Sequence, residues 1–358
     1  MKLHTLLLAV LIATNLISQN NVCFTIEENP NSSDPSLEVF SKYVDVYGCG
    51  IYAESTVSDD KVLHAAAIWA ELLDNNEDGV IDDLALHTEL LSNEAIMPIF
   101  ESDENAAMIS FMDNYDGNGV AAVLWQSEID PSQPGHWGDD ATVEEILHTI
   151  NAVGHVNVYP SAFDLSPNSS EMSAAMDAAR GGQFLTVPAV YPEVAWYHYD
   201  DETCDYECMA IEYMYWSIVS LMGILDDTST CNGISNEWEP CSPSLFESTD
   251  VLMYNLITDV AYKLPTEAPD GNYCPTGAGV SDIHNLPSFT ISPNPTSEIL
   301  TIKRNVNTPG FLRVCNGMGQ EVLVMKVETM EFQFDTNKLA SGTYSINLDN
   351  YNLQFIKE

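Results

Sequence analysis

A short acidic segment with one histidine, Asp139 to His148, holds residue types that can bind a metal ion or transfer protons. If the segment is helical, Glu144 and Glu145 precede His148 by four and three residues, and each shares a helical face with it. Carboxylates and an imidazole at these spacings can ligate a divalent metal or act as general acid and base. We therefore predict a metal or acid/base site at this segment.

Two residues further along the chain can complete such a site. His155 follows His148 by seven residues, which returns it to about the same face of an α-helix. Glu212 is the one charged residue in the apolar segment 209–225. A charge in a buried helix has to be paired, protonated or metal-bound. We predict that His155 and Glu212 join Glu144 and His148 as metal ligands.

This layout resembles the gluzincin metallopeptidases, whose site helix reads His-Glu-x-x-His and whose third ligand is a glutamate from a later helix. The resemblance implies that His148 and Glu212 are ligands and that Glu145 is the base that activates water. It also implies that Glu144 stands in for the first histidine, and that Tyr213 or Tyr215 donates to the oxyanion. A carboxylate in place of histidine weakens zinc binding and favours a harder ion such as Mn or Fe.

A purely structural interpretation of the same segment remains open. Thr142 and Glu145 have the spacing of a capping box, in which the two side chains satisfy the first backbone N–H groups of a helix. The acidic residues of the segment also favour a helix N-terminus, where the helix dipole stabilises negative charge. The buried Glu212 can likewise be satisfied by hydrogen bonds from neighbouring Tyr or Trp groups.

A second segment, residues 74–85, has the spacing of a calcium-binding loop. Oxygen-bearing side chains stand at its positions 1, 3, 5 and 9, with a glycine at position 6 and an apolar residue at position 8. It resembles the EF-hand loop but departs from it at position 12, where Ala85 replaces the bidentate glutamate. An ordinary turn rich in Asn, Asp and Gly is the alternative. The predicted calcium ligands are Asp74, Asn76, Asp78, Val80 and Asp82.

An aromatic and acidic stretch, Tyr191 to Glu207, indicates a different enzymatic chemistry. Paired carboxylates beside Trp196 and Tyr197 suit a glycan substrate and glycoside hydrolysis. The stretch holds too many carboxylates for a pair to be chosen, and an aromatic core patch between disulfide-bonded loops explains it equally well.

Composition and the first residues bear on where the protein works. Residues 1–19 read as a signal peptide, with a short basic start, the apolar run Leu6 to Ile12 and small residues near Ser18. The chain has 54 acidic and 11 basic residues, a net charge of −43, which excludes nucleic acid as a partner. Because an exported protein meets an oxidising compartment, we expect disulfides among its 8 cysteines, four of which crowd residues 204–241.

Periodicity predicts the elements that must position these residues. Helices are expected at 61–73, 84–91, 170–179 and 209–225, and another helix is expected to begin near Thr142 and end before Gly154. Strands are expected within 37–53 and at 120–125. The fold class is therefore α+β, a mostly helical main domain at residues 20–285 with few strands.

The last part of the chain, residues 286–358, differs in charge and pattern. Its six basic and seven acidic residues nearly balance, and seven short alternating segments predict a small β-sandwich. The stretches 291–295, Gly319-Gln320 and 339–344, with Lys357 near the end, resemble the type A C-terminal sorting domain of the type IX secretion system. The resemblance implies that the outer-membrane secretion machinery is a partner and that the protein, passing through the periplasm, is secreted or placed on the cell surface.

Together these features predict an exported cargo whose main domain is a metal-dependent hydrolase. The expected ion is Zn, Mn or Fe, and the expected substrate is a peptide or a glycan, with a peptidase as the leading expectation. The alternative is a non-catalytic binding or cell-surface protein that calcium stabilises.

Overall fold

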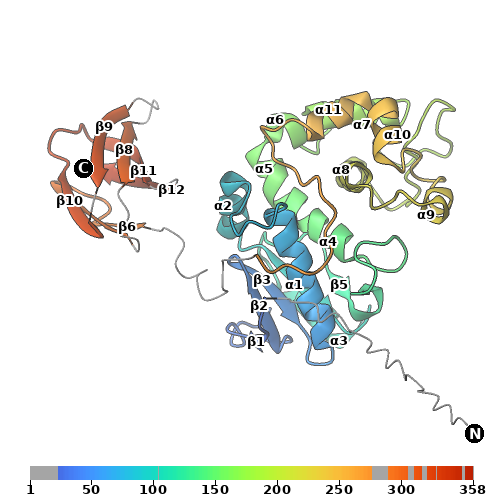
Figure 1. Cartoon of the computed structure of the whole chain (residues 1–358), viewed down its shortest axis with the longest axis horizontal. Helices are drawn as coiled ribbons and strands as arrows, with labels where there is room; N and C mark the ends of the chain where they lie inside the picture. Colours follow the sequence, from blue (N-terminus) through green and yellow to red (C-terminus); the bar gives the residue numbers. More distant parts are fainter. Residues whose placement is uncertain are drawn as a thin grey trace, which may run out of the picture. The chain divides into compact units, whose positions relative to one another are not determined.

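The computed structural model describes residues 23–103, 105–275, 289–304, 310–316, 321–327, 329–348 and 351–357. The chain divides into two compact units, residues 1–277 and 278–358. Both units confirm the α+β class with a β-rich C-terminal part (Figure 1). The predicted signal peptide and the predicted boundary near residue 285 lie outside the described residues.

A five-stranded sheet anchors the first unit, in the order β1 (Glu27–Glu28), β2 (Lys42–Val46), β3 (Cys49–Ala53), β4 (Ile96–Phe100) and β5 (Leu124–Trp125). Strands β1 to β3 pair antiparallel, whereas β4 lies parallel to both β3 and β5. A parallel neighbour needs a crossover connection. Here the crossover consists of α1 (Asp59–Leu73), the predicted calcium loop and α2 (Leu84–Ser92).

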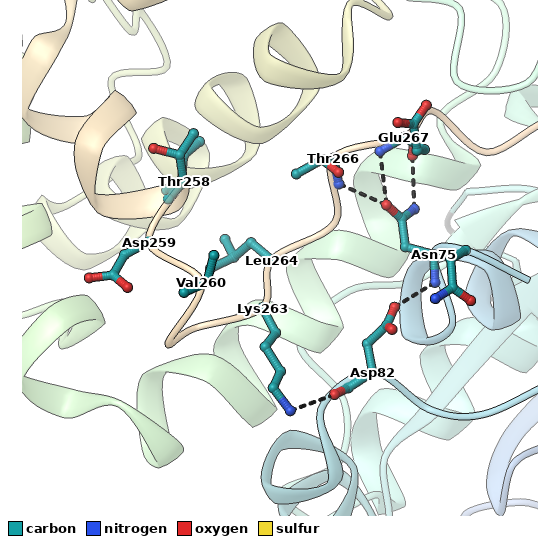
Figure 2. A pocket seen from close by; sticks show the side chains of 11 residues that line it. Asn75, Asp82, Thr258, Asp259, Val260, Lys263, Leu264, Thr266 and Glu267 are labelled. Carbon is teal, nitrogen blue, oxygen red and sulfur yellow. Dashed lines mark hydrogen bonds between the residues drawn. The ribbon is translucent and has the colours of Figure 1, made fainter. Parts of the chain in front are cut away.

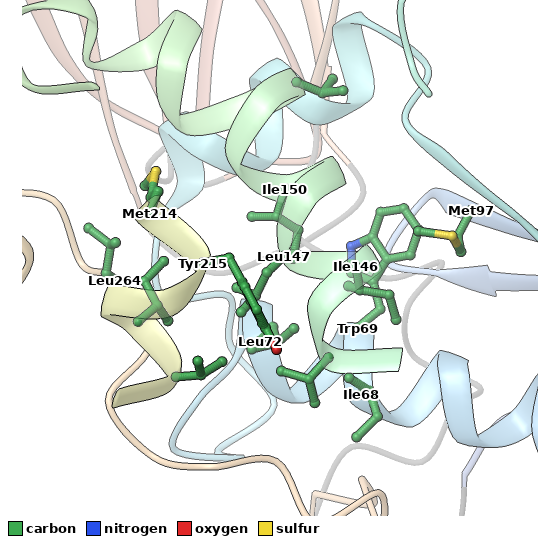
Figure 3. Packing of buried hydrophobic residues seen from close by; sticks show 14 of the residues in the cluster. Ile68, Trp69, Leu72, Met97, Ile146, Leu147, Ile150, Met214, Tyr215 and Leu264 are labelled. Carbon is green, nitrogen blue, oxygen red and sulfur yellow. The ribbon is translucent and has the colours of Figure 1, made fainter. Parts of the chain in front are cut away.

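The two central strands are buried on both faces, so that alternate residues enter different cores. In β4, Met97 and Ile99 join the large core, while Ile96 and Phe100 pack on the opposite face near α3 (Ala106–Asn114). Figure 3 shows the large core, where Trp69 of α1 packs beside Ile146 of the next long helix. This packing fixes the helix that carries the predicted metal ligands.

That helix is longer than expected. It begins as α4 (Thr142–Thr149), continues as a π-helix (Ile150–His155) and ends as α5 (Val156–Val158). The predicted end before Gly154 is wrong, because this glycine is a packing position within the helix. A Cβ atom at Gly154 would lie 2.3 Å from Leu86 Cδ1 of α2, so only glycine lets the two helices approach this closely.

The predicted capping box at the start of α4 is also wrong. Ala141 occupies the N-cap position and makes no side-chain cap. Thr142 donates its hydroxyl to Asp140 Oδ1 at 2.6 Å, and Asp140 Oδ2 accepts from Gly135 N and lies 3.1 Å from His64 Nε2. The polar residues before α4 therefore fold the preceding loop, and Glu145 is free of any capping role.

A second group of helices packs on the side of α4 away from the sheet. Its long member is α8 (Tyr206–Met222), which begins at the cap Asp205 and ends at Gly223, whose φ is 77°. Because α8 is buried along most of its length, it forms the centre of this part of the unit. The others are α6 (Pro160–Phe163), α7 (Glu171–Ala179), α9 (Thr228–Gly233), α10 (Pro243–Thr249) and α11 (Val251–Ile257).

Three disulfides join described residues of the first unit: Cys204–Cys208, Cys231–Cys241 and Cys23–Cys274. The first two confirm the expected stapling of the crowded region 204–241. The third ties the start of the described chain to the segment after α11. Cys49, which is buried, and Cys315 are free thiols.

The second unit is the predicted β-sandwich. One sheet has the strand order β10-β7-β6 and the other β12-β11-β8-β9, with antiparallel pairing throughout. Alternate residues such as Leu300, Val314 and Ile346 fill its core. The strands are β6 (Phe289–Ser292), β7 (Ile299–Arg304), β8 (Gly310–Asn316), β9 (Glu321–Val327), β10 (Glu331–Asp335), β11 (Gly342–Leu348) and β12 (Tyr351–Lys357).

Candidate metal centre

Helices α4 and α8 pack against each other and bring His148 between two glutamates. His148 Nδ1 lies 3.4 Å from Glu145 Oε2, one turn earlier on α4. His148 Nε2 lies 3.5 Å from Glu212 Oε2, which comes from α8. The predicted convergence of two helices on one imidazole is therefore present, although 64 residues separate His148 from Glu212 along the chain.

Glu144 completes an acidic cluster around this histidine. One ligand atom from each of Glu144, Glu145 and His148 lies within 4.8 Å of the other two, close enough to share one ion. Tyr215 of α8 borders the cluster, and its ring contacts the His148 ring edge-on at 5.6 Å between centroids. The site is thus a largely buried cluster of carboxylates beside an aromatic ring.

The titrations of the cluster reflect this crowding of negative charge. Burial raises the pKa of Glu144 to about 8; the attraction of His148 opposes this, and the nearby carboxylates of Glu145 and Glu212 add to it. Burial lowers the pKa of His148, but the carboxylates of Glu212 and Glu145 outweigh burial and hold that pKa well above its usual value. The cluster therefore gathers carboxylates whose charges a bound cation would offset.

The donor set fits a divalent transition metal. His148 Nε2 is buried and makes no hydrogen bond within the described part of the chain, since its approach to Glu212 lacks hydrogen-bond geometry. Its approach to the Glu212 carboxylate at 3.5 Å leaves the nitrogen without a well-formed hydrogen bond, and a metal ion bound between the two groups would satisfy both. A set of one nitrogen and several carboxylate oxygens suits Mn and Fe as well as Zn.

Tyr213 lies away from this cluster. Its hydroxyl donates to Asp250 Oδ2 at 2.6 Å, and its ring packs against Tyr197 and Trp238. The predicted catalytic donor at this position is therefore engaged elsewhere, whereas the alternative, Tyr215, contacts the cluster. The sequence did not separate the two tyrosines, because both lie on a helix that is buried nearly all round.

His155 also lies apart from the cluster. Its Nδ1 lies 2.9 Å from Asn151 Oδ1, and its ring packs edge-on against Phe163. The expected shared face assumed an α-helix throughout. The π-helix between His148 and His155 turns by less per residue, so seven residues do not bring the side chain back to the same face.

The predicted calcium loop folds between α1 and α2, with Asp74 buried and with Asn76, Asp78 and Val80 exposed. Asp74 is fully buried and accepts hydrogen bonds from the N–H groups of Asp78 and Gly79, at 3.1 and 2.8 Å. Asn76 Oδ1 accepts from Asp78 N, and Asp78 Oδ1 accepts from Val80 N. The side-chain oxygens of positions 1, 3 and 5 therefore accept hydrogen bonds from backbone N–H groups of the loop itself.

The loop also borders a cavity of about 510 Å³, which local sequence patterns do not predict. Figure 2 shows its wall, where Asn75 Oδ1 accepts from Thr266 N and Glu267 N, both at 2.8 Å. These partners lie in residues 264–275, which we call the strap. The contacts join residues about 190 positions apart, beyond the reach of local sequence patterns.

Comparison with protein families identifies the second unit. Residues 290–358 match the family described as the secretion system C-terminal sorting domain. No curated protein matches the chain. Within the described residues, no helix is long and apolar enough to span a membrane.

The chain is therefore an exported protein, secreted or placed on the cell surface, and its tail interacts with the type IX secretion machinery. What the first unit does has to be argued from its own geometry.

Proposed function

We propose that the first unit is a metal-dependent hydrolase that acts outside the cell on peptide substrates. The observation that carries the proposal is the convergence of Glu144, Glu145 and Glu212 on His148 from two helices. In this proposal His148, Glu212 and Glu144 are the ligands. The buried Nε2 atom of His148, which lacks a hydrogen bond in the described structure, supports its role as a ligand.

Glu145 is the base of the proposed reaction. Of the two glutamates that pair with His148, Glu145 has the more exposed side chain, at 22% against 15% for Glu212. A water molecule can therefore reach Glu145. A bound divalent metal supplies Lewis acidity that makes such a water a nucleophile near neutral pH. Glu145 then takes the proton of the attacking water and passes it to the leaving amine.

Tyr215 is the oxyanion donor in this scheme. Its ring packs against the imidazole of His148, one of the proposed ligands. Burial raises the pKa of Tyr215 above its usual value, and the carboxylates of Glu144 and Glu212 raise it further, so the phenol stays protonated. A protonated phenol in a water-poor site can donate to the tetrahedral intermediate. The roles of these residues are similar to those in gluzincins, with Glu144 in place of a histidine.

The test is hydrolysis of a broad peptide library by the purified full-length chain and two variants. Glu145→Gln keeps the size of the side chain and removes the base, so we expect activity to fall at least about 100-fold while metal content is unchanged. The matched control is Glu171→Gln, an exposed glutamate at the start of α7, which should retain full activity. Equal activity of wild type and Glu145→Gln would contradict the proposal.

A second candidate function is a non-catalytic extracellular protein that calcium stabilises. The inward-facing carboxylate of Asp74, fully buried at the first position of the loop, favours calcium binding there. In this case a chelator should lower the melting temperature, and Asp78→Ala should reduce that response. An unchanged melting temperature on chelation would rule this candidate out.

A further inference from the structure

A second group of acidic residues gathers beside the loop, at positions that the EF-hand pattern does not use. Glu71 lies in the last turn of α1, Glu77 is position 4 of the loop, and Asp270 belongs to the strap. One carboxylate oxygen from each lies within 4.8 Å of the other two. Three segments of the chain thus present carboxylates to one point.

Glu71 is the buried member of this group. Only 2% of the residue is exposed, and its Oε2 accepts hydrogen bonds from Asp270 N at 2.6 Å and Gly271 N at 3.2 Å. Its other oxygen, Oε1, is buried and makes no hydrogen bond within the described part of the chain. A buried carboxylate oxygen without a partner is costly, because its hydration is lost without replacement.

The surroundings of Glu71 add negative charge instead of relieving it. Burial raises its pKa to about 7; the two backbone N–H groups oppose this shift, and the carboxylates of Asp270 and Glu77 add to it. Lys263, the basic residue of the nearby cavity, donates instead to the backbone oxygen of Asp82 at 2.8 Å (Figure 2). A cation from solution would satisfy Oε1 and the two exposed carboxylates together.

We propose that Glu71, Glu77 and Asp270 form a binding site for a calcium ion that fastens the strap to the end of α1. Calcium takes oxygen ligands at 2.3–2.6 Å, so two ligands of one ion are at most about 5 Å apart, which matches the spacing of this group. The group holds no nitrogen or sulfur ligand, which disfavours zinc and copper. The two exposed carboxylates leave room for the water ligands that complete a calcium shell.

The site has a structural consequence for the strap. Its residues already hydrogen-bond to Asn75 and Glu71, and Tyr273 donates to Asp74 Oδ2 before the Cys23–Cys274 disulfide closes the segment. A bound ion adds a link between Asp270 and α1. Calcium binding therefore slows the opening of the strap and of the cavity that it borders.

The experiment is a calorimetric titration of calcium into the chelator-treated full-length chain at physiological ionic strength. Wild type is compared with Asp270→Asn and Glu77→Gln, which change exposed side chains and should leave the fold intact, and with Asp78→Asn in the neighbouring loop. We expect Asp270→Asn and Glu77→Gln each to lose one calcium equivalent relative to wild type. Asp78→Asn should keep that equivalent, which separates this site from the loop. Titrations of the first two variants that match wild type would overturn the proposal.

Hydrogen exchange of the strap gives an independent readout. In wild type, calcium should slow amide exchange of residues 264–275, and Asp270→Asn should remove this effect. The isosteric variant Glu71→Gln should also lose calcium sensitivity, because it removes the anionic ligand that belongs to α1. Calcium-dependent protection that persists in both variants would refute the assignment.

Discussion

The imidazole of His155 should make the protein lose stability in mild acid, and the variant His155→Gln tests this. His155 is fully buried, its Nδ1 contacts Asn151, and its Nε2 makes no hydrogen bond to any described residue. Burial lowers its pKa from 6.5 to about 4, and the carboxylate of Asp83 opposes this only weakly. The folded protein therefore keeps His155 neutral at a pH where the unfolded chain protonates it.

The size of the effect follows from the two pKa values. A difference between 6.5 and about 4 corresponds to about 3 kcal/mol of unfolding free energy. Above pH 6.5 the protein has the full unfolding free energy that goes with a neutral His155 in both states. As the pH falls from there toward 4, the unfolded state binds one proton more than the folded state, so stability drops by about 1.4 kcal/mol per pH unit.

The assay is urea unfolding at a series of pH values between about 4 and 7.5 for wild type and His155→Gln. Glutamine retains a hydrogen-bonding group for Asn151 and does not titrate. The variant should start less stable at neutral pH, and the gap should narrow by about 3 kcal/mol toward pH 4. Ser248→Ala, at an exposed position of α10 that carries no titratable group, is the control that should leave the pH dependence unchanged. Parallel curves for wild type and His155→Gln would refute the reasoning.

Three further predictions concern packing and closure. Gly154→Ala should cost about 1–3 kcal/mol in urea unfolding, because the new methyl group overlaps Leu86, and an unchanged midpoint would contradict the close approach of α2. Asn75→Ala should cost about 2–4 kcal/mol by removing four hydrogen bonds, three of them to the strap, measured as a lower melting temperature. Replacing Cys23 and Cys274 together by serine should lower the free energy of unfolding by about 3–5 kcal/mol, because their disulfide closes a loop of 251 residues. An unchanged melting temperature in calorimetry would contradict the presence of this disulfide.

Local patterns predicted the parts of the fold that depend on local interactions. The apolar stripe of α1, the turn chemistry around Gly79 and the apolar length of α8 each appear in the structure at the predicted place. All seven strands of the tail follow the predicted alternation. Such features arise from residues within a few positions of one another, which is the range that periodicity samples.

Features that depend on distant partners were missed or misread. Thr142 has the sequence of a cap, but its hydroxyl donates to Asp140, whose carboxylate contacts His64, 76 residues earlier in the chain. The continuation of α4 through Gly154 depends on Leu86, and the buried position of Glu71 depends on the strap about 200 residues later. Tertiary contacts decide such positions, and a single sequence does not display them.

The same division applies to the candidate metal centre. Glu144, Glu145 and His148 were predicted together because they share one helix turn, and Glu212 was added because a charge stands out in an apolar helix. The choice of Tyr215 over Tyr213 required the structure, since only the three-dimensional packing shows which hydroxyl faces the cluster.

The most direct test of the metal centre is the transition-metal content of the purified chain, measured by elemental analysis after extensive dialysis. We predict about one Zn, Mn or Fe ion per wild-type chain, and loss of that ion in Glu212→Gln, because this variant removes the ligand from α8 while the fold keeps its packing. Glu171→Gln should retain the ion. A wild-type chain without stoichiometric metal, or a Glu212→Gln variant that binds as much metal as wild type, would contradict the account.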